Sequence, residues 1–361
     1  MALVAGATRG AGRAIAVELA RAGFFVYATG RSSRSTGPSE IGRPETIDDT
    51  GELISAAGGD GSARVVDHED PAAVAELVAD IERERGRLDV LVNDIFGGDR
   101  YMEWDKPLWE HEWDGGLRML QMGVHTHLIT CRAAIPLMLQ TARDHKTRGL
   151  VVEMTDGTSD ANAEFRRNVG FYYDLVKANV ERIVKGLAAE LGGLPITAVG
   201  VTPGWLRSEK MLENFGVTEA NWRDAVERRP GFGISESPTY VARGVAAVAQ
   251  ADDVERWSGT IVSAASSQTR TTSPIPTEAG PTAGATSPPT AGSTTTVAAS
   301  MSFGNQNGST AASPELTTRR SSSSGVHSGI LAQANALHPG CQQADRELAP
   351  RCPASGRCGR D

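Results

Sequence analysis

A short apolar segment that runs directly into a glycine-rich loop constrains the fold more than any other feature of this sequence. ALVAG predicts a strand, GATRGAG a loop and RAIAVELARAG a helix. Gly6 permits a tight turn out of the strand, whereas Gly10 and Gly12 let the backbone approach a ligand and the helix approach the sheet. The first amides of the helix would then face a pyrophosphate. The alternative is a tight turn without a ligand.

Strand patterns alternate with helix patterns as far as residue 263, which indicates an α/β protein with parallel strands and right-handed crossovers. Further strands are expected at 24–30, 63–70, 88–98, 149–157, 195–201 and 260–262, and further helices at 47–57, 71–86, 113–140, 171–191 and 240–250. Ligands of such sheets bind beyond the carboxyl ends of the strands. Gly6, Arg31, Asp67 and Asn93 are expected at those ends.

The second strand ends in GRSSR and not in an acidic residue, which bears on the choice of dinucleotide. An Asp or Glu here would bind the ribose 2′-hydroxyl of NAD, whereas an arginine accommodates the 2′-phosphate of NADP. Arg31, and Arg9 in the glycine loop, would both reach that phosphate, and Thr8 is a further candidate cofactor residue. The sequence therefore favours NADP over NAD. The alternative is that the arginines are solvated surface charges.

Two residues four apart on the helix expected at 171–191, Tyr173 and Lys177, form the candidate catalytic pair. Positions i and i+4 lie on one face of a helix, so the lysine ammonium would sit near the phenol. A phenol has a pKa of about 10, and a nearby cation favours the phenolate. Tyr173 would then exchange a proton near neutral pH. The alternative is a packed ring beside a solvated charge.

Aromatic side chains are dense between the fourth strand and the long helix. Tyr101, Trp104, Trp109, His111 and Trp113 would wall a substrate pocket or, equally, cover a helix or a subunit contact. Later in the chain, LRSEKMLENFGVTEANWRDAV predicts short helices that form a lid.

We expect no metal, nucleic-acid or membrane partner. His125 and His127 lack the i, i+4 spacing of a metal pair on a helix and are expected to be structural or pocket polar groups. A net charge of -8 opposes nucleic-acid binding, and no apolar run is long enough to span a membrane. Of the four cysteines, Cys131 lies in a helical pattern and the others in a tail, so we expect no disulfide framework and a cytoplasmic location.

Composition changes near residue 263. All six Trp and all five Tyr lie at or before Trp257. From about Ser263 onward the sequence is rich in Ser, Thr, Pro, Gly and Ala, and its apolar residues have no periodic spacing. Such a segment cannot bury enough surface to offset its ordering entropy. We therefore expect one globular domain at 1–263 and a disordered low-complexity tail at 264–361.

Both ends of the sequence look unlike those of a natural domain. The first strand begins directly after Met1, so we expect the natural start to lie upstream. GC-rich codons read from the third base of Ala264 permit GQLANANDFTDTDGSRPD, which looks like a conventional domain ending. We therefore hypothesise a frameshift near residue 263. The alternative is a genuine Ser/Thr/Pro tail.

Residues 1–263 resemble the short-chain dehydrogenase/reductase family. The match rests on GATRGAG, Asp67, VND at 92–94, YDLVK at 173–177 and TPG at 202–204. The resemblance implies a doubly wound Rossmann domain, assembled as a homodimer or homotetramer, with nicotinamide hydride chemistry on a small molecule. It also implies that Tyr173 is the general acid/base and that Lys177 binds the nicotinamide ribose and lowers the tyrosine pKa.

The same resemblance implies roles for the other matching residues. Asp67 would contact the adenine, and Asn93 would help to hold the central strand and the cofactor. Pro203 and Gly204 would border the nicotinamide, with Ser208 near its carboxamide or the diphosphate.

Three departures from the family pattern stand out. NDIFG at 93–97 replaces the usual NNAG, so larger residues stand where small ones are usual. Asp156 aligns with the catalytic serine, and Thr155 and Thr158 lie beside it. A threonine hydroxyl would polarise a carbonyl as serine does, whereas an ionised Asp156 cannot donate a hydrogen bond. Gly123 aligns with the helix asparagine that usually completes a proton relay.

Three functions follow for this pattern. The first is an NADP-dependent oxidoreductase that interconverts a carbonyl and an alcohol, with Thr155 or Asp156 assisting Tyr173 and Lys177. The second is a non-catalytic dinucleotide-binding protein of the same fold, and the third a lyase or epimerase.

Overall fold

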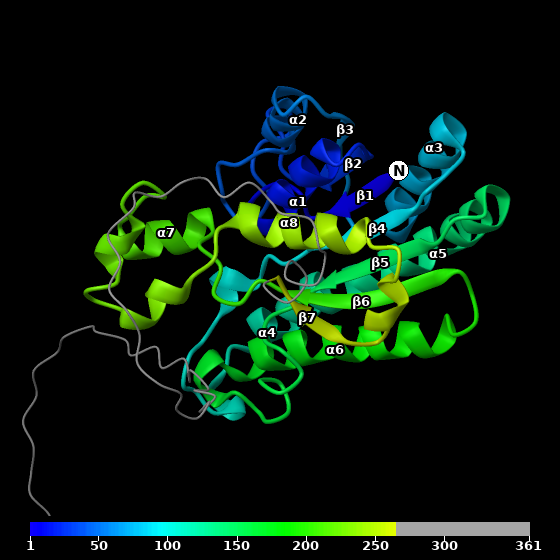
Figure 1. Cartoon of the computed structure of the whole chain (residues 1–361). Coiled ribbons are helices and arrows are strands. Elements are labelled where there is room, and N and C mark those ends of the chain that lie inside the picture. Colours follow the sequence, from blue (N-terminus) through cyan, green and yellow to red (C-terminus); the bar gives the residue numbers. More distant parts are fainter. Residues whose placement is uncertain (265–361) are drawn as a thin grey trace, which may run out of the picture. The chain divides into compact units, whose positions relative to one another are not determined.

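The computed structural model describes residues 1–264, so the tail predicted beyond Ala264 lies outside the described residues. Within residues 1–264, one sheet of seven strands has the order β3-β2-β1-β4-β5-β6-β7, and every neighbouring pair is parallel (Figure 1). The strands are β1 (Ala2–Ala5), β2 (Phe25–Gly30), β3 (Asp60–Val65), β4 (Val90–Asn93), β5 (Gly149–Met154), β6 (Ile196–Thr202) and β7 (Ile261–Ser263). The predicted doubly wound parallel sheet is confirmed.

The chain changes its direction of travel through the sheet between β1 and β4. It adds β2 and β3 on one side of β1 and then crosses to β4 on the other side. Ala5 at the end of β1 is paired with Thr29 of β2 and with Asn93 of β4. The loops after β1 and β4 therefore diverge at one edge, which is where ligands bind in such sheets.

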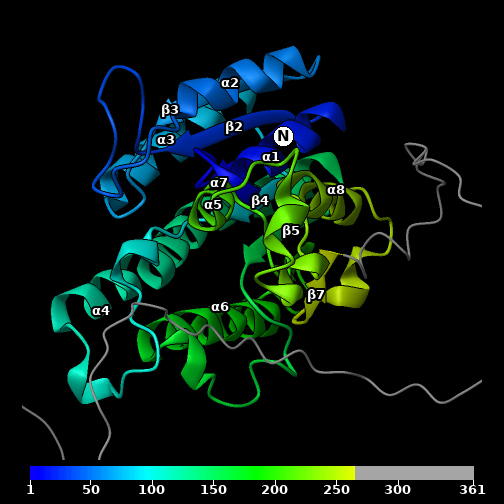
Figure 2. The ribbon, with the colours of Figure 1, turned by 90° about the vertical axis from the view of Figure 1, so that its left-hand side faces the viewer.

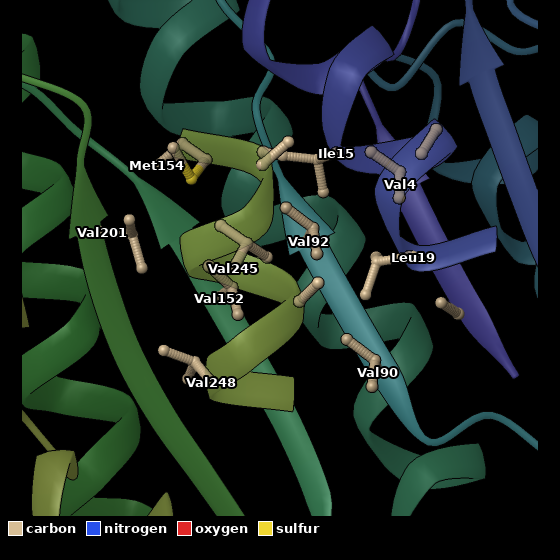
Figure 3. Close-up of a cluster of buried hydrophobic side chains, with 14 of the residues drawn as sticks. Val4, Ile15, Leu19, Val90, Val92, Val152, Met154, Val201, Val245 and Val248 are labelled. Atoms are coloured by element: carbon tan, nitrogen blue, oxygen red, sulfur yellow. The ribbon is translucent and has the colours of Figure 1, made fainter. Parts of the chain in front are cut away.

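Helices cover both faces of the sheet. One face carries α1 (Gly10–Arg21), α2 (Ile47–Ala56) and α8 (Pro238–Ala249), and the other carries α3 (Pro71–Arg85), α5 (Thr126–His145) and α6 (Phe171–Glu190). Figure 3 shows the first face, where apolar side chains at helical spacing, such as Ile15 and Leu19, meet alternate residues of the strands, such as Val90 and Val92. Leu91, between those two valines, belongs to the core on the opposite face. Burial on both faces explains why the strands are apolar throughout.

The third strand starts and ends earlier than the predicted 63–70. Backbone pairing with β2 makes Asp60–Val65 the strand, although Asp, Gly and Ser have low strand propensity. Gly61 permits this pairing, because a Cβ there would lie 2.5 Å from the carbonyl oxygen of Val26. Asp67 consequently lies in the loop after the strand.

The helix predicted at 113–140 is longer and is not uniform. α4 (Trp113–Leu120), a π-helical turn (Gln121–His125) and α5 follow one another without a gap as far as His145. Gly123 lies in the π-helical turn, where a Cβ would lie 2.5 Å from Cγ1 of Val176. The absence of a side chain at this glycine therefore allows the turn to pack closely on α6.

The side chain of Ala264, the last described residue, is fully buried. Within residues 1–264 the helices are too short or too polar to cross a membrane. In the same part of the chain, no three His, Cys, Asp or Glu side chains gather as metal ligands would. Cys131 is buried and forms no disulfide.

Candidate active site

The glycine loop has the close contacts that the sequence predicts. Gly6 leaves β1 with a φ of 86°, and a Cβ on it would lie 2.5 Å from the carbonyl oxygen of Asp94. A Cβ on Gly12 would lie 2.3 Å from the carbonyl oxygen of Gly6. Gly10 begins α1 with a φ of 59°. Larger residues here would push apart the strand, the helix and the loop after β4.

A carboxylate from elsewhere in the chain occupies the amide end of α1. The Gly10 N–H donates to both carboxylate oxygens of Glu209, at 3.0 and 3.2 Å, and the Arg13 guanidinium lies 4.0 Å from one of them. Glu209 is the first residue of α7 (Glu209–Phe215), which lies on the side to which the strands point and faces the viewer in Figure 2. The start of α1 therefore accepts an anionic group, which is what the predicted pyrophosphate site requires.

A narrow cavity runs from the glycine loop past the end of β2, and its wall includes Thr8 and Asp67. Arg31 also lines it and donates to Glu69 at 2.9 Å, with Glu40 3.8 Å away. Arg9 lines it too and donates to Asp99 at 2.8 Å. Both arginines predicted to bind a 2′-phosphate therefore face this cavity, and carboxylates balance their charge.

A second cavity, of about 570 Å³, lies beyond the carboxyl ends of β4, β5 and β6. Gly6, Arg9, Asp94 and Phe96 line both cavities, so the two adjoin and are together called the cleft. Its wall also contains Gly10, Thr155, Asp156, Tyr173, Lys177, Pro203, Gly204 and Ser208. The cleft thus brings together all the predicted catalytic residues and every predicted cofactor residue except Gly12 and Asn93.

Tyr173 faces a carboxylate. Its hydroxyl donates to Oδ2 of Asp156 at 3.0 Å. Burial, together with the charge and the hydrogen bond of Asp156, raises the pKa of Tyr173 well above its ordinary value, and Arg166 opposes this rise. Lys177 is farther away, with its Nζ 5.6 Å from the centre of the Tyr173 ring. The expectation that a cation lowers the pKa of Tyr173 is therefore not met, because burial and the charge of Asp156 outweigh it.

Arg166 completes a charged cluster that the sequence did not reveal. It donates through Nη1 to Oδ2 of Asp156 at 3.1 Å and through Nε to Oδ1 of Asp174 at 2.8 Å. Arg166 lies between β5 and α6, where no periodic pattern sets the backbone. The available signal was the basic FRRN segment close to Tyr173, which does not show which arginine turns inward.

Phe96, which stands where the family has a small residue, packs on both members of the candidate pair. Nζ of Lys177 lies 4.1 Å from the centre of the Phe96 ring, and the Tyr173 ring meets it edge-on at 5.7 Å between ring centres. A Cβ on Gly123 would lie 3.2 Å from Cδ2 of Phe96. The departures at positions 96 and 123 therefore compensate each other, since the glycine leaves room for the ring.

Neither neighbouring threonine takes the place of the serine. Thr155 donates its hydroxyl proton to the carbonyl oxygen of Lys177 at 3.0 Å, so it ties β5 to α6. The Thr158 hydroxyl accepts from the amide of Ala161 at 3.4 Å, away from Tyr173. The suggestion that a threonine hydroxyl polarises the substrate is therefore not supported by these contacts.

Asn93 lies inside the molecule behind the cleft. Its Nδ2 donates to Oε1 of Glu153 at 2.8 Å, and the other oxygen of Glu153 lies 2.5 Å from Nδ1 of His127. Nε2 of His127 contacts the carbonyl oxygen of Ile95 at 3.0 Å. This buried network joins β4, β5 and α5, which agrees with the strand-holding role expected of Asn93 and with a structural role for His127.

Most of the aromatic side chains predicted to wall a pocket lie elsewhere. Trp104 lines the cleft, but Trp109 and Trp113 are 84% and 65% exposed. His111 instead meets the ring of Tyr172 edge-on, with ring centres 5.6 Å apart. The remaining aromatic rings of the cleft wall, which sequence analysis missed, are those of Phe96, Trp205 and Phe215.

Comparison with known proteins agrees with this geometry. A family model described as enoyl-(acyl carrier protein) reductase matches residues 6–264. Dehydrogenase/reductase SDR family member 1 of Mus musculus is 28% identical over 268 residues, covering 72% of this chain and 78% of that protein. A 3-oxoacyl-[acyl-carrier-protein] reductase of Staphylococcus aureus is 28% identical over 209 residues, covering 58% of this chain and 75% of that protein.

Solved structures show the same fold. A variant of a Serratia marcescens short-chain dehydrogenase/reductase has a TM-score of 0.57 at 23% identity and covers 73% of this chain and 94% of its own. A variant of the actinorhodin polyketide ketoreductase, solved with NADPH, has a TM-score of 0.57 at 21% identity with the same coverage. Since the family model spans most of the sequence, the chain belongs to the short-chain dehydrogenase/reductase family of oxidoreductases, which are generally NAD(P)-dependent.

Proposed function

We propose that this protein is an NADP-dependent oxidoreductase that interconverts a carbonyl and an alcohol on a small molecule. One observation carries the proposal: Tyr173 and Lys177 line the same cleft as the glycine loop and the Pro203-Gly204 turn. A dinucleotide that follows the cleft from the glycine loop would bring its nicotinamide to this pair. The bound nicotinamide supplies or accepts the hydride, so the side chains need only move the proton.

The residues of the cleft suit the parts of the dinucleotide in turn. The Gly10 amide and the N-terminus of α1 would bind the pyrophosphate once Glu209 has moved aside, and Ser208 lies next to Glu209. Asp67 would contact the adenine, and Lys177 would bind the nicotinamide ribose. Tyr173 would exchange the proton of the substrate oxygen.

Arg31 and Arg9 support the choice of NADP over NAD. Both line the cleft near the end of β2, where an arginine accommodates the 2′-phosphate. The ion pairs with Glu69 and Asp99 hold the two guanidinium groups in place, and a phosphate would compete with those carboxylates. The similar polyketide ketoreductase was crystallised with NADPH, which agrees with this choice.

The substrate end of the cleft favours a molecule with an apolar body. Its wall carries large apolar side chains around the candidate pair, namely Met102, Trp104, Val169, Trp205, Met211 and Phe215. Such walls bind apolar surface, while a few polar groups fix the reacting atom. We therefore propose a carbonyl or alcohol attached to an apolar group.

We further propose a cytoplasmic homodimer or homotetramer. Exposed large apolar side chains on α4, α5, α6 and the turn before α4 support an assembly, namely Leu108, Trp109, Trp113, Leu117, Leu128 and Leu175. The free thiol of Cys131 suits a reducing compartment. Sedimentation of the purified protein would test the assembly.

Cofactor spectroscopy tests the proposed activity. NADPH and NADH fluorescence would be titrated with the protein, and a panel of ketones, aldehydes and alcohols would then be added with the reduced or oxidised dinucleotide. We expect binding and a change of cofactor redox state with at least one substrate. Binding without any conversion would contradict the proposal and favour a non-catalytic dinucleotide-binding protein. Product formed without net cofactor change would indicate a lyase or epimerase.

A further inference from the structure

The hydrogen bond between Tyr173 and Asp156 has a defined direction. A carboxylate accepts but cannot donate, so the phenol donates the hydrogen bond to Asp156. Within residues 1–264 no other group donates to the Tyr173 oxygen, so its lone pairs stay available to a ligand in the cleft. The phenol is thus placed to accept a proton on one side while it gives one up on the other.

Asp156 is held from two further directions. Arg166 bridges Asp156 and Asp174, which lies in the first turn of α6. Nδ2 of Asn162 donates to the carbonyl oxygen of Asp156 at 3.0 Å and to that of Gly157 at 3.4 Å. The segment between β5 and α6 therefore fixes both the backbone and the side chain of Asp156.

The charged groups near Tyr173 and Asp156 come from several surrounding elements. Arg166 contacts Asp156 directly, and Lys177 and Asp174 lie on α6. Asp94, after β4, and Asp99, in the turn Gly98–Tyr101, complete the set, with Asp99 itself paired to Arg9. Arg166 is the cation in contact with Asp156 and offsets its charge.

The surroundings of Lys177 and of Asp156 differ in polarity. Near Lys177, the ring of Phe96 and a methyl group of Val176 fill the space next to Gly123. The side chain of Asp156, by contrast, is 20% exposed. A proton that arrives on Asp156 can therefore pass to solvent.

We propose that Asp156 is the proton acceptor of Tyr173 and that Arg166 is the positioning residue that holds it there, an inference that rests on the proposed function. In alcohol oxidation the carbinol C–H bond breaks and its hydride leaves to the oxidised nicotinamide. The alcohol O–H proton passes to the Tyr173 oxygen as the Tyr173 proton passes to Oδ2 of Asp156. Tyr173 is thus a neutral phenol before and after the step, and Asp156 carries the released proton.

This arrangement links the two directions of the reaction to one group. Oxidation needs a carboxylate at position 156 to accept the Tyr173 proton, whereas carbonyl reduction is the reverse step and returns that proton to Tyr173. Asp156→Asn removes the carboxyl, so the rates of oxidation and of reduction should both fall.

The contact can be tested without a substrate. Ionisation of Tyr173 would be followed by ultraviolet difference absorbance, with Tyr173→Phe subtracted to remove the other tyrosines. In Asp156→Asn we expect Tyr173 to ionise about 1 to 3 pH units lower than in the unaltered protein, because a like charge has gone. An unchanged titration would overturn the proposal, whatever the turnover.

The roles of Asp156 and Arg166 are tested by steady-state kinetics with the alcohol and the ketone of the panel that the protein converts best. Asp156→Asn should lower kcat about a hundredfold or more with little change in KM. Arg166→Met should lower kcat in the same way, Arg166→Lys should restore part of it, and the double variant should be no slower than Asp156→Asn alone. Additive losses would mean that Arg166 acts independently of Asp156 and would overturn its positioning role.

Arg64 provides the matched control, because it also bridges two carboxylates, Asp80 and Glu84, but lies away from the cleft. Arg64→Met should leave kcat unchanged in both directions, and circular dichroism would confirm that every variant folds. An unchanged kcat in Asp156→Asn would overturn the proton relay. An unaltered protein that binds dinucleotide but converts nothing would contradict the proposed activity and the relay together, while the tyrosine titration would still decide the contact.

Discussion

Tyr173 keeps its proton in this site because the side chain is buried and because its hydroxyl donates to a carboxylate that an arginine holds. Tyr173→Phe removes that hydroxyl and keeps the ring that packs edge-on against Phe96. We expect steady-state turnover to fall about a hundredfold or more, the scale of lost general acid/base catalysis, while NADPH affinity stays nearly intact. Tyr172→Phe is the control, since Tyr172 is buried against Gly116 and should matter much less. A larger loss from Tyr172→Phe would show that the wrong tyrosine has been assigned.

Arg31 offers a second single-residue prediction, on the choice of cofactor. Arg31→Asp removes a cation that would pair with a 2′-phosphate and adds a repulsive charge close to Glu69 and Glu40. We expect the ratio of NADH to NADPH affinity, measured by fluorescence titration, to rise. Equal affinities for the two dinucleotides in the unaltered protein would remove the basis for this expectation.

Asp94 gives a prediction on stability, because its carboxyl is partly buried beneath the glycine loop and beside the cleft. Burial raises its pKa from 3.8 to about 6, although Lys177 and the Gly12 amide oppose the rise. The folded state thus favours the protonated form of Asp94. The contribution of this carboxyl to folding stability is therefore fully present below pH 3.8 and is lost as pH rises through about 6. Asp94→Asn cannot ionise and should raise the free energy of unfolding at pH 8 by about 3 kcal/mol.

Denaturant unfolding at two pH values checks the sign of this effect. The advantage of Asp94→Asn should be present at pH 8 and lost at about pH 3, where the carboxyl of Asp94 is mostly protonated in both the folded and the unfolded state. An advantage of equal size at both pH values would show that packing, and not titration, is responsible.

At the scale of elements, α7 lies across the cofactor cleft and is held there by carboxylates. Glu209 accepts from the Gly10 amide, and Glu213 pairs with Arg43, which lines the cleft near the end of β2. A pyrophosphate bound as proposed would have to displace Glu209 before it could bind the same amide. We therefore expect α7 to compete with the cofactor for the anion site at the start of α1.

Glu209→Gln tests this competition. The variant weakens the contact with Gly10 and Arg13, so we expect the Kd for NADPH to fall about tenfold, the equivalent of one charge-assisted hydrogen bond. Glu219→Gln is the matched control, because Glu219 pairs with Arg207 and makes no contact with the glycine loop. A Kd that does not change, or that rises, would contradict a competing role for Glu209.

Elements with a strong local pattern could be predicted from the sequence, and those formed by distant contacts could not. The glycine loop, α1 and α6 carry their own periodicity and special residues, so Gly6, Gly10, Tyr173 and Lys177 were identified from the sequence. β3 depends on pairing with β2, which overrides the propensity of its own residues. The contact of Glu209 with Gly10 joins residues 199 apart, and no pattern in either segment encodes it.

At the scale of the whole molecule, the parallel order of the strands collects the candidate site at one edge of the sheet. The loops after β1, β4, β5 and β6 contribute Gly6, Phe96, Asp156 and Pro203 to the same cleft. These four residues are far apart in the sequence. Fold class was predictable because the alternation of strands and helices fixes this edge. The inward turn of Arg166 was not, because it depends on charges that only meet once the sheet has formed.

The last prediction concerns where the folded unit ends. Ala264 and Val262 are buried in the core beside α8, whereas the sequence beyond them has the composition of a low-complexity tail. Deleting 265–361 should therefore leave the melting temperature and the NADPH affinity unchanged. Deleting 262–361 instead removes part of β7 and its buried side chains, and should lower the melting temperature by about 4 °C or more. A lower melting temperature or weaker NADPH binding after the shorter deletion would show that residues beyond 264 contribute to the fold, against the expectation from their composition.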